Sequence, residues 1–548
     1  MKHTLTLLIA LLLAPLAVLQ AADFKFTPEH QAAVNRQRRI FFQYDPYADI
    51  QQKGGFGGDI HAVMRYVFDF ADMPGSQLDA ICIDVSNEGV AHYRSGILRP
   101  IQHPGLVKWR EQGVDYFDAL IQHGHQRGKE IWWGLRINEV ERGDLAAYEP
   151  LRYGEFKERN PVKAAHPEWL IRSWWWQGFW NYAVKEVRDY RLSVVREVVE
   201  QYDFDGVHLD FLRHTPFLPP GKQWENREHL TSFMRDVRGM LQTQAAKRGR
   251  PFLLAARLPD SVDGCHSDGI DLETWATQGL VDVLIIGTRT INVDVASFRK
   301  AVAGAPVKLL PSFDCFHATD GYFGDQSLDL LRGVFGNYLH QSADGVGIFN
   351  NPAGSAEHAK KLGLTQQANY APEILTTIGS LKTIAGKPRY YAIERRGGYA
   401  HNEGYGSANN HAPLPVTLRY DGTPSTLTLR VWEPVKPGTE VRLRLVLFNH
   451  VEGDEVTVQL NGTLLKRELV DPQWKDARIF SPLPQPETVV PTNVVKNLVA
   501  QKLARVEFKV PVETLKRGPN TLAIAVNRTG PFHASQPVKV EKVELHVK

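Results

Sequence analysis

Residues 202–214 carry the clearest pattern of hydrophobic and polar positions in the chain. Before this stretch, apolar residues recur at steps of three to four, which is the period of an amphipathic helix, at Val184, Val187, Val194, Val198 and Tyr202. Within it, Val207, Leu209 and Phe211 alternate with His208 and Asp210, which is the period of a strand. The pattern predicts a helix, a turn over residues 203–206, and a buried strand with Asp210 at its carboxyl end.

The same alternation of helix and strand patterns runs through most of the chain. Strands are predicted at residues 39–45, 78–85, 130–138, within 202–214, and at 251–257, 281–288, 307–314 and 345–350. Helices are predicted between them at 59–71, 107–127, 184–202, 225–248, 271–279, 295–303 and 328–341, with more helix at 357–384. Eight strands that alternate with helices predict a (β/α)8 TIM barrel over residues 23–388.

The texture of the sequence changes near residue 389. Strand-like alternation dominates from there to residue 548, and Asp421-Gly422 and Asn461-Gly462 supply turn signals between the segments. This pattern predicts an all-β sandwich as a C-terminal accessory domain, residues 389–548.

The N-terminus has the composition of a signal peptide. Lys2 gives a basic start, residues 5–19 form an apolar core, and Ala21-Ala22 supply small residues for cleavage. We therefore expect residues 1–22 to be removed and the protein to be secreted or periplasmic, without a membrane span.

Composition excludes some classes of function. A net charge of +3 without a clustered basic face argues against a nucleic-acid binder. The 12 Trp and 18 Tyr indicate either surfaces on which sugars stack or a large core. The 3 Cys are too few for a disulfide framework. No zinc-ligand spacing or other cofactor motif is present, so neither a metal nor a cofactor is expected.

Arginines follow four predicted strands in succession: Arg136, Arg213, Arg257 and Arg289. If they converge on the barrel mouth, they suit an anionic group such as a carboxylate or sulfate. The alternative is that they neutralise carboxylates of the site itself. In the long insertion after the third strand, Trp175 and Trp176 lie in a segment that either lines the cleft or plugs the space beneath the insertion.

Carboxylates at predicted strand ends are candidates for catalysis. Asp210 and Asp314 end strands four and seven, which lie across the barrel mouth from each other. Glycoside cleavage needs such a pair, one group to protonate the leaving oxygen and one to attack or activate water. We predict Asp210 as the nucleophile and Asp314 as the acid, with Glu139 in reserve.

Two segments resemble a known family. Residues 205–214, DGVHLDFLRH, resemble the strand-four signature of the family-10-like glycosyl hydrolase group (GHL10 type), and residues 133–139, WGLRINE, resemble its strand-three signature. The resemblance covers about residues 39–351 and implies a barrel glycoside hydrolase in which Asp210 is catalytic. Arg136, Asn138 and His208 are then predicted to contact the carbohydrate.

Two other classes of function compete with the hydrolase. One is a non-catalytic glycan-binding protein on a barrel scaffold, and the other is a polysaccharide lyase with an arginine-neutralised uronate. A second carboxylate near Asp210, within about 5–10 Å, would favour hydrolysis.

Overall fold

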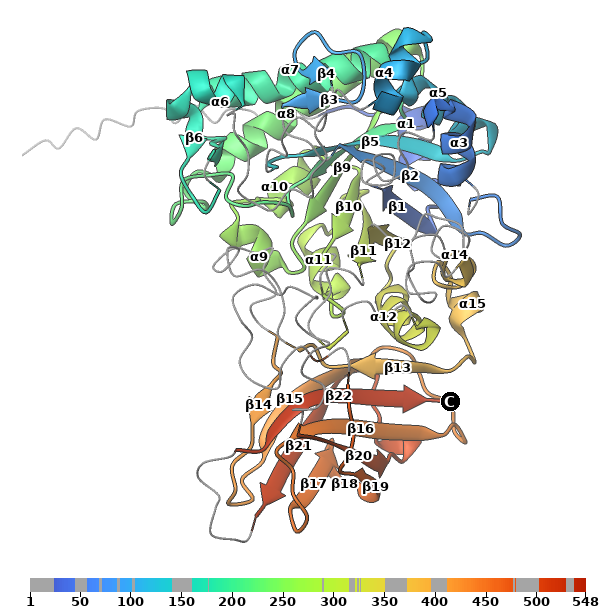
Figure 1. The fold of residues 1–548 in the computed structure, drawn as a ribbon, viewed down its shortest axis with the longest axis vertical. Helices are drawn as coiled ribbons and strands as arrows, with labels where there is room; N and C mark the ends of the chain where they lie inside the picture. The colour runs from blue at the N-terminus through green and yellow to red at the C-terminus, as the bar shows by residue number, and fades with distance from the viewer. Residues whose placement is uncertain are drawn as a thin grey trace, which may run out of the picture.

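Eight parallel strands close into a barrel, which confirms the predicted (β/α)8 architecture (Figure 1). The fold is described from a computed structural model, which describes residues 24–44, 57–68, 71–85, 89–100, 104–139, 160–175, 177–287, 290–314, 321–322, 325, 327–349, 372–395, 412–476, 479, 502–528 and 537–548. The barrel strands are β1 (Ile40–Tyr44), β2 (Leu78–Val85), β5 (Glu130–Arg136), β8 (Gly206–Asp210), β9 (Leu253–Leu258), β10 (Val283–Ile286), β11 (Lys308–Phe313) and β12 (Val346–Phe349). The predicted signal peptide lies outside the described residues.

The barrel strands are buried on both faces, and the alternation along each strand decides which layer a side chain joins. In β5, Ile131, Trp133 and Leu135 pack outward with the helices, while Trp132 points inward. Trp132 shares the barrel interior with residues from five other strands: Phe41, Ala80, Cys82, Leu253, Ala255, Val283, Ile285 and Leu310. The lower part of the barrel is therefore a packed core, and polar inward positions remain at the carboxyl ends of the strands.

Helices surround the barrel (Figure 1). Among the described residues they are α1 (Pro28–Asn35), α3 (Ile60–Phe68), α4 (Pro104–Glu111), α5 (Tyr116–Gln126), α6 (Pro161–Ala165), α7 (Lys185–Gln201), α8 (Arg227–Arg248), α9 (Val262–Ser267), α10 (Leu272–Thr277), α11 (Val295–Ala301), α12 (Leu328–His340), α14 (Pro372–Thr377) and α15 (Leu381–Ile384). The predicted helix at 184–202 is α7, which ends at the turn before β8. Two pairs of short strands lie outside the barrel. One is the parallel pair of β3 (Val90–Ala91) and β4 (Arg99–Pro100), and the other is the antiparallel pair of β6 (Leu170–Ile171) and β7 (Phe179–Trp180).

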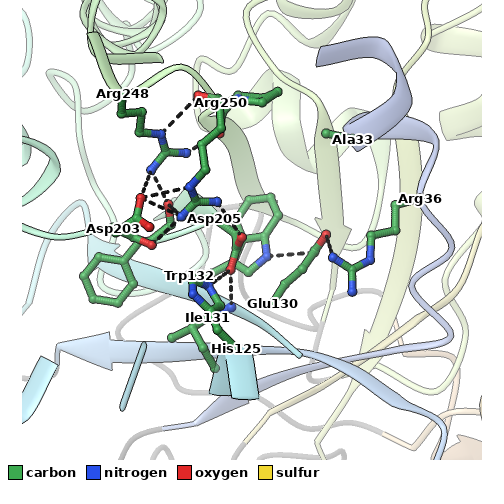
Figure 2. A network of polar contacts seen from close by, with 12 residues as sticks. Ala33, Arg36, His125, Glu130, Ile131, Trp132, Asp203, Asp205, Arg248 and Arg250 are labelled. Carbon is green, nitrogen blue, oxygen red and sulfur yellow. Dashed lines mark hydrogen bonds and ion pairs between the residues drawn. The ribbon is translucent and has the colours of Figure 1, made fainter. Parts of the chain in front are cut away.

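Polar residues at the amino-terminal end of the barrel hold the strand starts together (Figure 2). Asp205, in the turn before β8, accepts hydrogen bonds from the backbone amide of Ile131 (2.7 Å) and from Arg250 (2.9 Å), and its Oδ2 lies 2.8 Å from Nε2 of His125. Asp282 likewise accepts from the amide of Leu254 (2.8 Å). Because carboxylates at this end of a barrel serve stability, Asp282 is structural, as its position at the start of a strand predicts.

A second group of sheets follows the barrel in sequence and lies at one end of it in Figure 1. One sheet contains β13 (Arg389–Ala392), β14 (Val416–Thr417), β16 (Val441–Phe448), β19 (Lys466–Asp471), β20 (Leu503–Lys509) and β22 (Lys539–Val547); the other contains β15 (Ser425–Val431), β17 (Glu455–Leu460), β18 (Thr463–Leu464) and β21 (Gly518–Asn527). Alternating apolar residues of both sheets share one core.

The helix α12 joins the barrel to these sheets (Figure 1). A Cβ on Gly333 would lie 1.9 Å from the carbonyl oxygen of Tyr390 in β13, so glycine is required for this close approach. Asn337, one turn further along α12, donates to the carbonyl of Arg430 (3.0 Å) and accepts from the amide of Trp432 (2.9 Å). The α12 helix thus makes direct backbone contact with the C-terminal sheets.

A search of the described helices for a long apolar segment that could cross a membrane finds none.

Candidate active site at the carboxyl ends of β5, β8 and β9

Asp210 ends β8 with its side chain in the barrel interior and fully buried. Its Oδ1 accepts a hydrogen bond from the backbone amide of Leu212 (2.9 Å), and its Oδ2 accepts from Nη1 of Arg257 (3.0 Å). Register explains this pair, since Asp210 and Arg257 are direct partners across β8 and β9. The same Arg257 nitrogen also donates to Oε1 of Gln43 in β1 (3.0 Å), which places residues from three strands around one carboxylate.

These partners keep Asp210 ionised. Burial by itself would raise the pKa of Asp210, but Arg257, Arg136 and the Leu212 amide outweigh it and lower the pKa below its usual value. A carboxylate held in its charged form within an apolar barrel suits a nucleophile or a stabiliser of positive charge.

Glu139 forms a second buried carboxylate site on the neighbouring strand. It follows β5 and makes an ion pair with Arg136, three residues earlier, and its Oε1 lies 2.9 Å from Nδ1 of His214. Burial opposes ionisation, yet Arg136, His214 and Arg213 together hold the pKa of Glu139 well below its usual range. Glu139 is therefore also an ionised carboxylate.

Arg136 connects the two carboxylates. It is the register partner of Asp210 across β5 and β8, it pairs with Glu139, and its charge lowers the pKa of both groups. The amide of Ile137 donates to the carbonyl of Asp210 (3.0 Å), which fixes the backbones of the two strands together at this level. The structure thus brings Asp210 and Glu139 to adjacent strand ends around one guanidinium group.

His208 lies two residues before Asp210, so it faces the same interior one layer deeper. Its ring is fully buried, and neither ring nitrogen has a hydrogen-bond partner in the described part of the chain. Burial lowers the pKa of His208 to about 3, against the opposing charge of Asp210. The imidazole is therefore neutral and lies beneath the carboxylate of Asp210. At this depth a direct contact with a carbohydrate is not favoured.

Asn138 anchors the chain at both of its amide atoms. Its Nδ2 donates to the carbonyl of Pro216 (2.8 Å), and its Oδ1 accepts from the amide of Trp180 (2.9 Å). These bonds tie the loops after β5 and β8 to each other. Both amide atoms of the side chain that the sequence predicts to bind substrate therefore have partners within the protein.

Asp314 comes directly after β11 and is fully buried. In the closed barrel β11 is separated from β8 by β10 and β9, so Asp314 and Asp210 belong to strands on different sides of the mouth. Ser312, two residues earlier, faces inward against Gly347 of β12, where a Cβ would lie 2.9 Å from that of Ser312. Alternation then gives Asp314 the same inward direction, as predicted.

The described part of the insertion after β5 contacts His214, the partner of Glu139. Trp175 is only 4% exposed and clusters with Phe179, while the ring of Trp174 lies 5.6 Å from that of His214. The indole of Trp174 also donates to the carbonyl of Thr215 (3.3 Å). Burial of Trp175 favours the packing interpretation over a stacking surface for sugars. Trp176 and Arg289 lie outside the described residues.

Two contributors to the site were not among the predicted residues. Gln43 was not singled out, although it occupies an inward position near the end of β1 and inward polar residues at strand ends are the signal that found Asp210. His214 is the other contributor, and its Nδ1 lies 2.9 Å from Oε1 of Glu139. Arg213, also near Glu139, is almost fully buried. Within the described ranges, no group of three or more His, Cys, Asp or Glu side chains is arranged to hold a metal ion.

Comparison with known proteins agrees with the resemblance seen in the sequence. Residues 64–228 match the family described as Glycosyl hydrolase-like 10, which confirms that resemblance and includes β5, β8, Glu139 and Asp210. The curated protein Glycosyl hydrolase YngK of Bacillus subtilis (strain 168) is 21% identical over 175 residues, which is 32% of this chain and 32% of that protein. The match thus spans about a third of the length of this curated relative.

Three of the solved structures that this chain matches have TM-scores below 0.5. An α-amylase from Geobacillus thermoleovorans complexed with acarbose has a TM-score of 0.37 and 14% identity, with 90% of this chain and 99% of that chain covered. The PgaB (BpsB) glycoside hydrolase domain from Bordetella bronchiseptica has a TM-score of 0.38 and 12% identity, with 63% and 99% covered. The α-L-fucosidase isoenzyme 2 from Paenibacillus thiaminolyticus has a TM-score of 0.37 and 14% identity, with 65% and 51% covered.

Proposed function

We propose that this protein is a glycoside hydrolase that cleaves a polysaccharide or oligosaccharide. The observation that carries the proposal is the match of residues 64–228 to the Glycosyl hydrolase-like 10 family, because the matched segment contains Asp210, the proposed nucleophile, together with its charged neighbours Arg136 and Glu139. Two carboxyl groups at a barrel mouth are the groups that glycosidic bond hydrolysis requires.

Asp210 is the nucleophile or the carboxylate that stabilises the developing oxocarbenium ion. Its lowered pKa supports this role, because the group must be ionised when the anomeric carbon becomes electron-deficient. Arg257 and the Leu212 amide orient one oxygen each, so the carboxylate is fixed before a substrate arrives.

The proton donor to the leaving oxygen is Asp314. Its inward direction and its place on another side of the mouth support this role. Glu139, the reserve candidate, has a pKa held well below its usual range by Arg136 and His214, and a group that is already ionised is a poor general acid near neutral pH.

An anionic glycan, sulfated or containing uronate, is the proposed substrate class. Arg136 and Arg257 already pair with carboxylates of the site, so they support the interpretation that these arginines neutralise their surroundings. Recognition of an anionic substituent therefore depends on Arg213 and Arg289. If these arginines recognise an anionic substituent, the rate of turnover should fall as the salt concentration is raised through about 0.15 to 1 M. The reason is that dissolved ions screen the attraction between the arginines and the glycan.

The proposed setting is outside the cytoplasm, in the periplasm or the medium, which rests on the signal-peptide pattern of residues 1–22. The C-terminal all-β region, residues 389–548, is proposed as a domain separate from the barrel of residues 23–388, with carbohydrate as the partner of the whole protein.

The test is a screen of purified protein against neutral, sulfated and uronate-containing glycans, with detection of new reducing ends. We expect new reducing ends from at least one anionic glycan, and their loss in Asp210→Asn. Glycan binding by calorimetry without new reducing ends would instead favour a non-catalytic binding protein. An unsaturated product that absorbs in the ultraviolet would favour the lyase.

A further inference from the structure

The segment that leaves the barrel for the C-terminal sheets turns a carboxylate back toward the barrel mouth. Glu394 follows β13, and its Oε2 accepts from the hydroxyl of Thr290 (2.9 Å) while its Oε1 accepts from the amide of Ile291 (3.0 Å). Thr290 and Ile291 belong to the loop that follows β10, on the face where barrels carry their chemistry. Glu394 is 5% exposed, so these two bonds form in a site shielded from water.

The loop after β10 is packed against its neighbours over a short length. The amide of Gly287 donates to the carbonyl of Leu258 at the end of β9 (2.9 Å). Gly287 has φ +71°, and a Cβ there would lie 3.4 Å from Cβ of Asp260, two residues beyond β9, and 3.0 Å from Cγ2 of Val293. The hydroxyl of Tyr338 in α12 donates to the carbonyl of Thr290 (3.0 Å). Residues from β9, α12 and the C-terminal segment therefore all contact this loop. The Glu394 carboxylate accepts the hydrogen bonds that the Thr290 hydroxyl and the Ile291 amide donate.

Glu394 is itself fixed by the residues on either side. The amide of Ile393 donates to the carbonyl of Val543 in β22 (3.0 Å), and Arg395 donates from Nε (3.0 Å) and Nη2 (2.7 Å) to Oε2 of Glu541. The side chains of Arg395 and Glu541 are both fully buried. An uncompensated charge there would be costly, so this pair holds the backbone around Glu394 in place.

We propose that Glu394 is a positioning residue, through which the C-terminal sheets fix the loop after β10 at the mouth of the barrel. The C-terminal region is then a component of the active site and not an independent accessory. The consequence for catalysis rests on the proposed function, while the positioning of the loop does not. Because a displacement of about 1 Å in a substrate-positioning group can reduce a rate by roughly 100-fold, the sheets contribute to turnover without contacting the substrate.

The test compares three variants of the full chain. Glu394→Ala removes both acceptors. Glu394→Gln keeps an oxygen that accepts from the Ile291 amide. Its NH2 group replaces the other oxygen and can donate to the Thr290 hydroxyl, so both contacts are kept. Asp454→Ala is the matched control, because Asp454 is a buried carboxylate of the C-terminal region that accepts from Arg528 (2.6 Å) and from the amide of Val451 (2.9 Å).

The first measurement is hydrogen–deuterium exchange of the peptide that contains residues 287–293, well below the unfolding temperature. We expect exchange at least tenfold faster in Glu394→Ala, and close to wild type in Glu394→Gln and Asp454→Ala. Exchange in Glu394→Ala equal to that of the wild type overturns the proposal, as does an equal increase in Asp454→Ala, which would mean that any damage to the C-terminal region loosens the loop.

The second measurement is kcat/KM on the glycan that the wild type cleaves. We expect a loss of at least tenfold in Glu394→Ala, and recovery to within threefold in Glu394→Gln. Unchanged kcat/KM in Glu394→Ala with faster exchange overturns the catalytic part of the proposal. If the wild type cleaves none of the glycans, the proposed function fails and exchange alone decides whether Glu394 positions the loop.

Discussion

Nη1 of Arg257 lies 3.0 Å from Oδ2 of Asp210, and both side chains are fully buried. A carboxylate in a barrel interior needs a cation at this distance to stay ionised, and the cation in turn depends on the carboxylate. The pair therefore couples the chemistry of the site to the stability of the barrel.

Asp210→Asn is expected to abolish turnover and also to destabilise the fold. The amide carries no charge, so the buried Arg257 loses its ion pair with Asp210, and breaking a buried pair costs about 3–5 kcal/mol. Urea unfolding gives the free energy and reducing-end release gives the activity. The double variant Asp210→Asn/Arg257→Met should recover much of the stability and none of the activity, and recovery of activity would show that Asp210 is not the nucleophile.

Substitution of Asp314 and of Glu139 distinguishes the two candidates for the general acid. Asp314→Asn should reduce turnover of substrates with poor leaving groups far more than turnover of activated aryl glycosides, because an activated leaving group needs no protonation. Glu139→Gln should reduce turnover of both substrate classes alike, through its effects on Arg136 and His214. If Asp314→Asn is silent on both while Glu139→Gln is inactive on natural substrates alone, the proton donor is on β5.

Replacement of Trp174 and of Trp175, two neighbouring tryptophans of the insertion, should have different consequences. Trp175 is buried, so Trp175→Ala should lower the free energy of unfolding by about 3–5 kcal/mol, with changes in KM that follow the loss of structure. Trp174 is partly exposed, and Trp174→Phe removes its hydrogen bond to Thr215 with less loss of packing. Chemical unfolding and Michaelis–Menten kinetics on the same samples distinguish a loss of packing from a loss of substrate binding. A raised KM with an unchanged free energy of unfolding in Trp175→Ala would restore the stacking interpretation.

A methyl group at Gly206 should be poorly tolerated. A Cβ at this position would lie 2.3 Å from Cζ3 of Trp132, whose ring is fully buried in the barrel interior and cannot move away without displacing the core. We expect Gly206→Ala to cost about 1–3 kcal/mol by thermal or urea unfolding. Gly239→Ala in α8 is the control, because the nearest atom outside its own helix is 4.0 Å away and alanine favours helix, so it should be neutral or stabilising.

The buried His208 should make stability depend on pH below neutrality. Burial lowers the pKa of His208 from 6.5 to about 3, so between these values the unfolded chain binds a proton that the folded protein does not. The contribution of neutral His208 to the free energy of unfolding is fully present above pH 6.5. It is lost as the pH falls toward 3, by about 1.4 kcal/mol per pH unit. Urea unfolding between pH 7.5 and 5 measures the slope.

Two variants test the origin of that slope. His208→Gln should reduce the slope by about 1.4 kcal/mol per pH unit, whereas His61→Gln, on the exposed surface of α3, should leave it unchanged. An undiminished slope in His208→Gln would assign the pH dependence to other groups, among them His214, whose pKa burial also lowers to about 3.

The sequence by itself determined the barrel and the direction of its site residues. Two-residue alternation at Val207, His208, Leu209 and Asp210 distinguishes the apolar outer layer from the polar interior, and the alternation of strands with helices fixes the order of the elements. These features are local, so they can be read along the chain. The segment 64–228 also contains enough of the family signature to be recognised.

The tertiary structure decided which charges meet. Arg257 contacts Asp210, 47 residues away, and Gln43, 214 residues away, because closure of the barrel brings β1, β8 and β9 around one interior. No periodicity along the chain specifies such a contact, and for this reason an arginine suited to bind an anion could not be distinguished from one that neutralises its neighbour. The contact of Glu394 with the loop after β10 has the same origin, since 103 residues separate Glu394 from Ile291 and the docking of two folded regions brings them together.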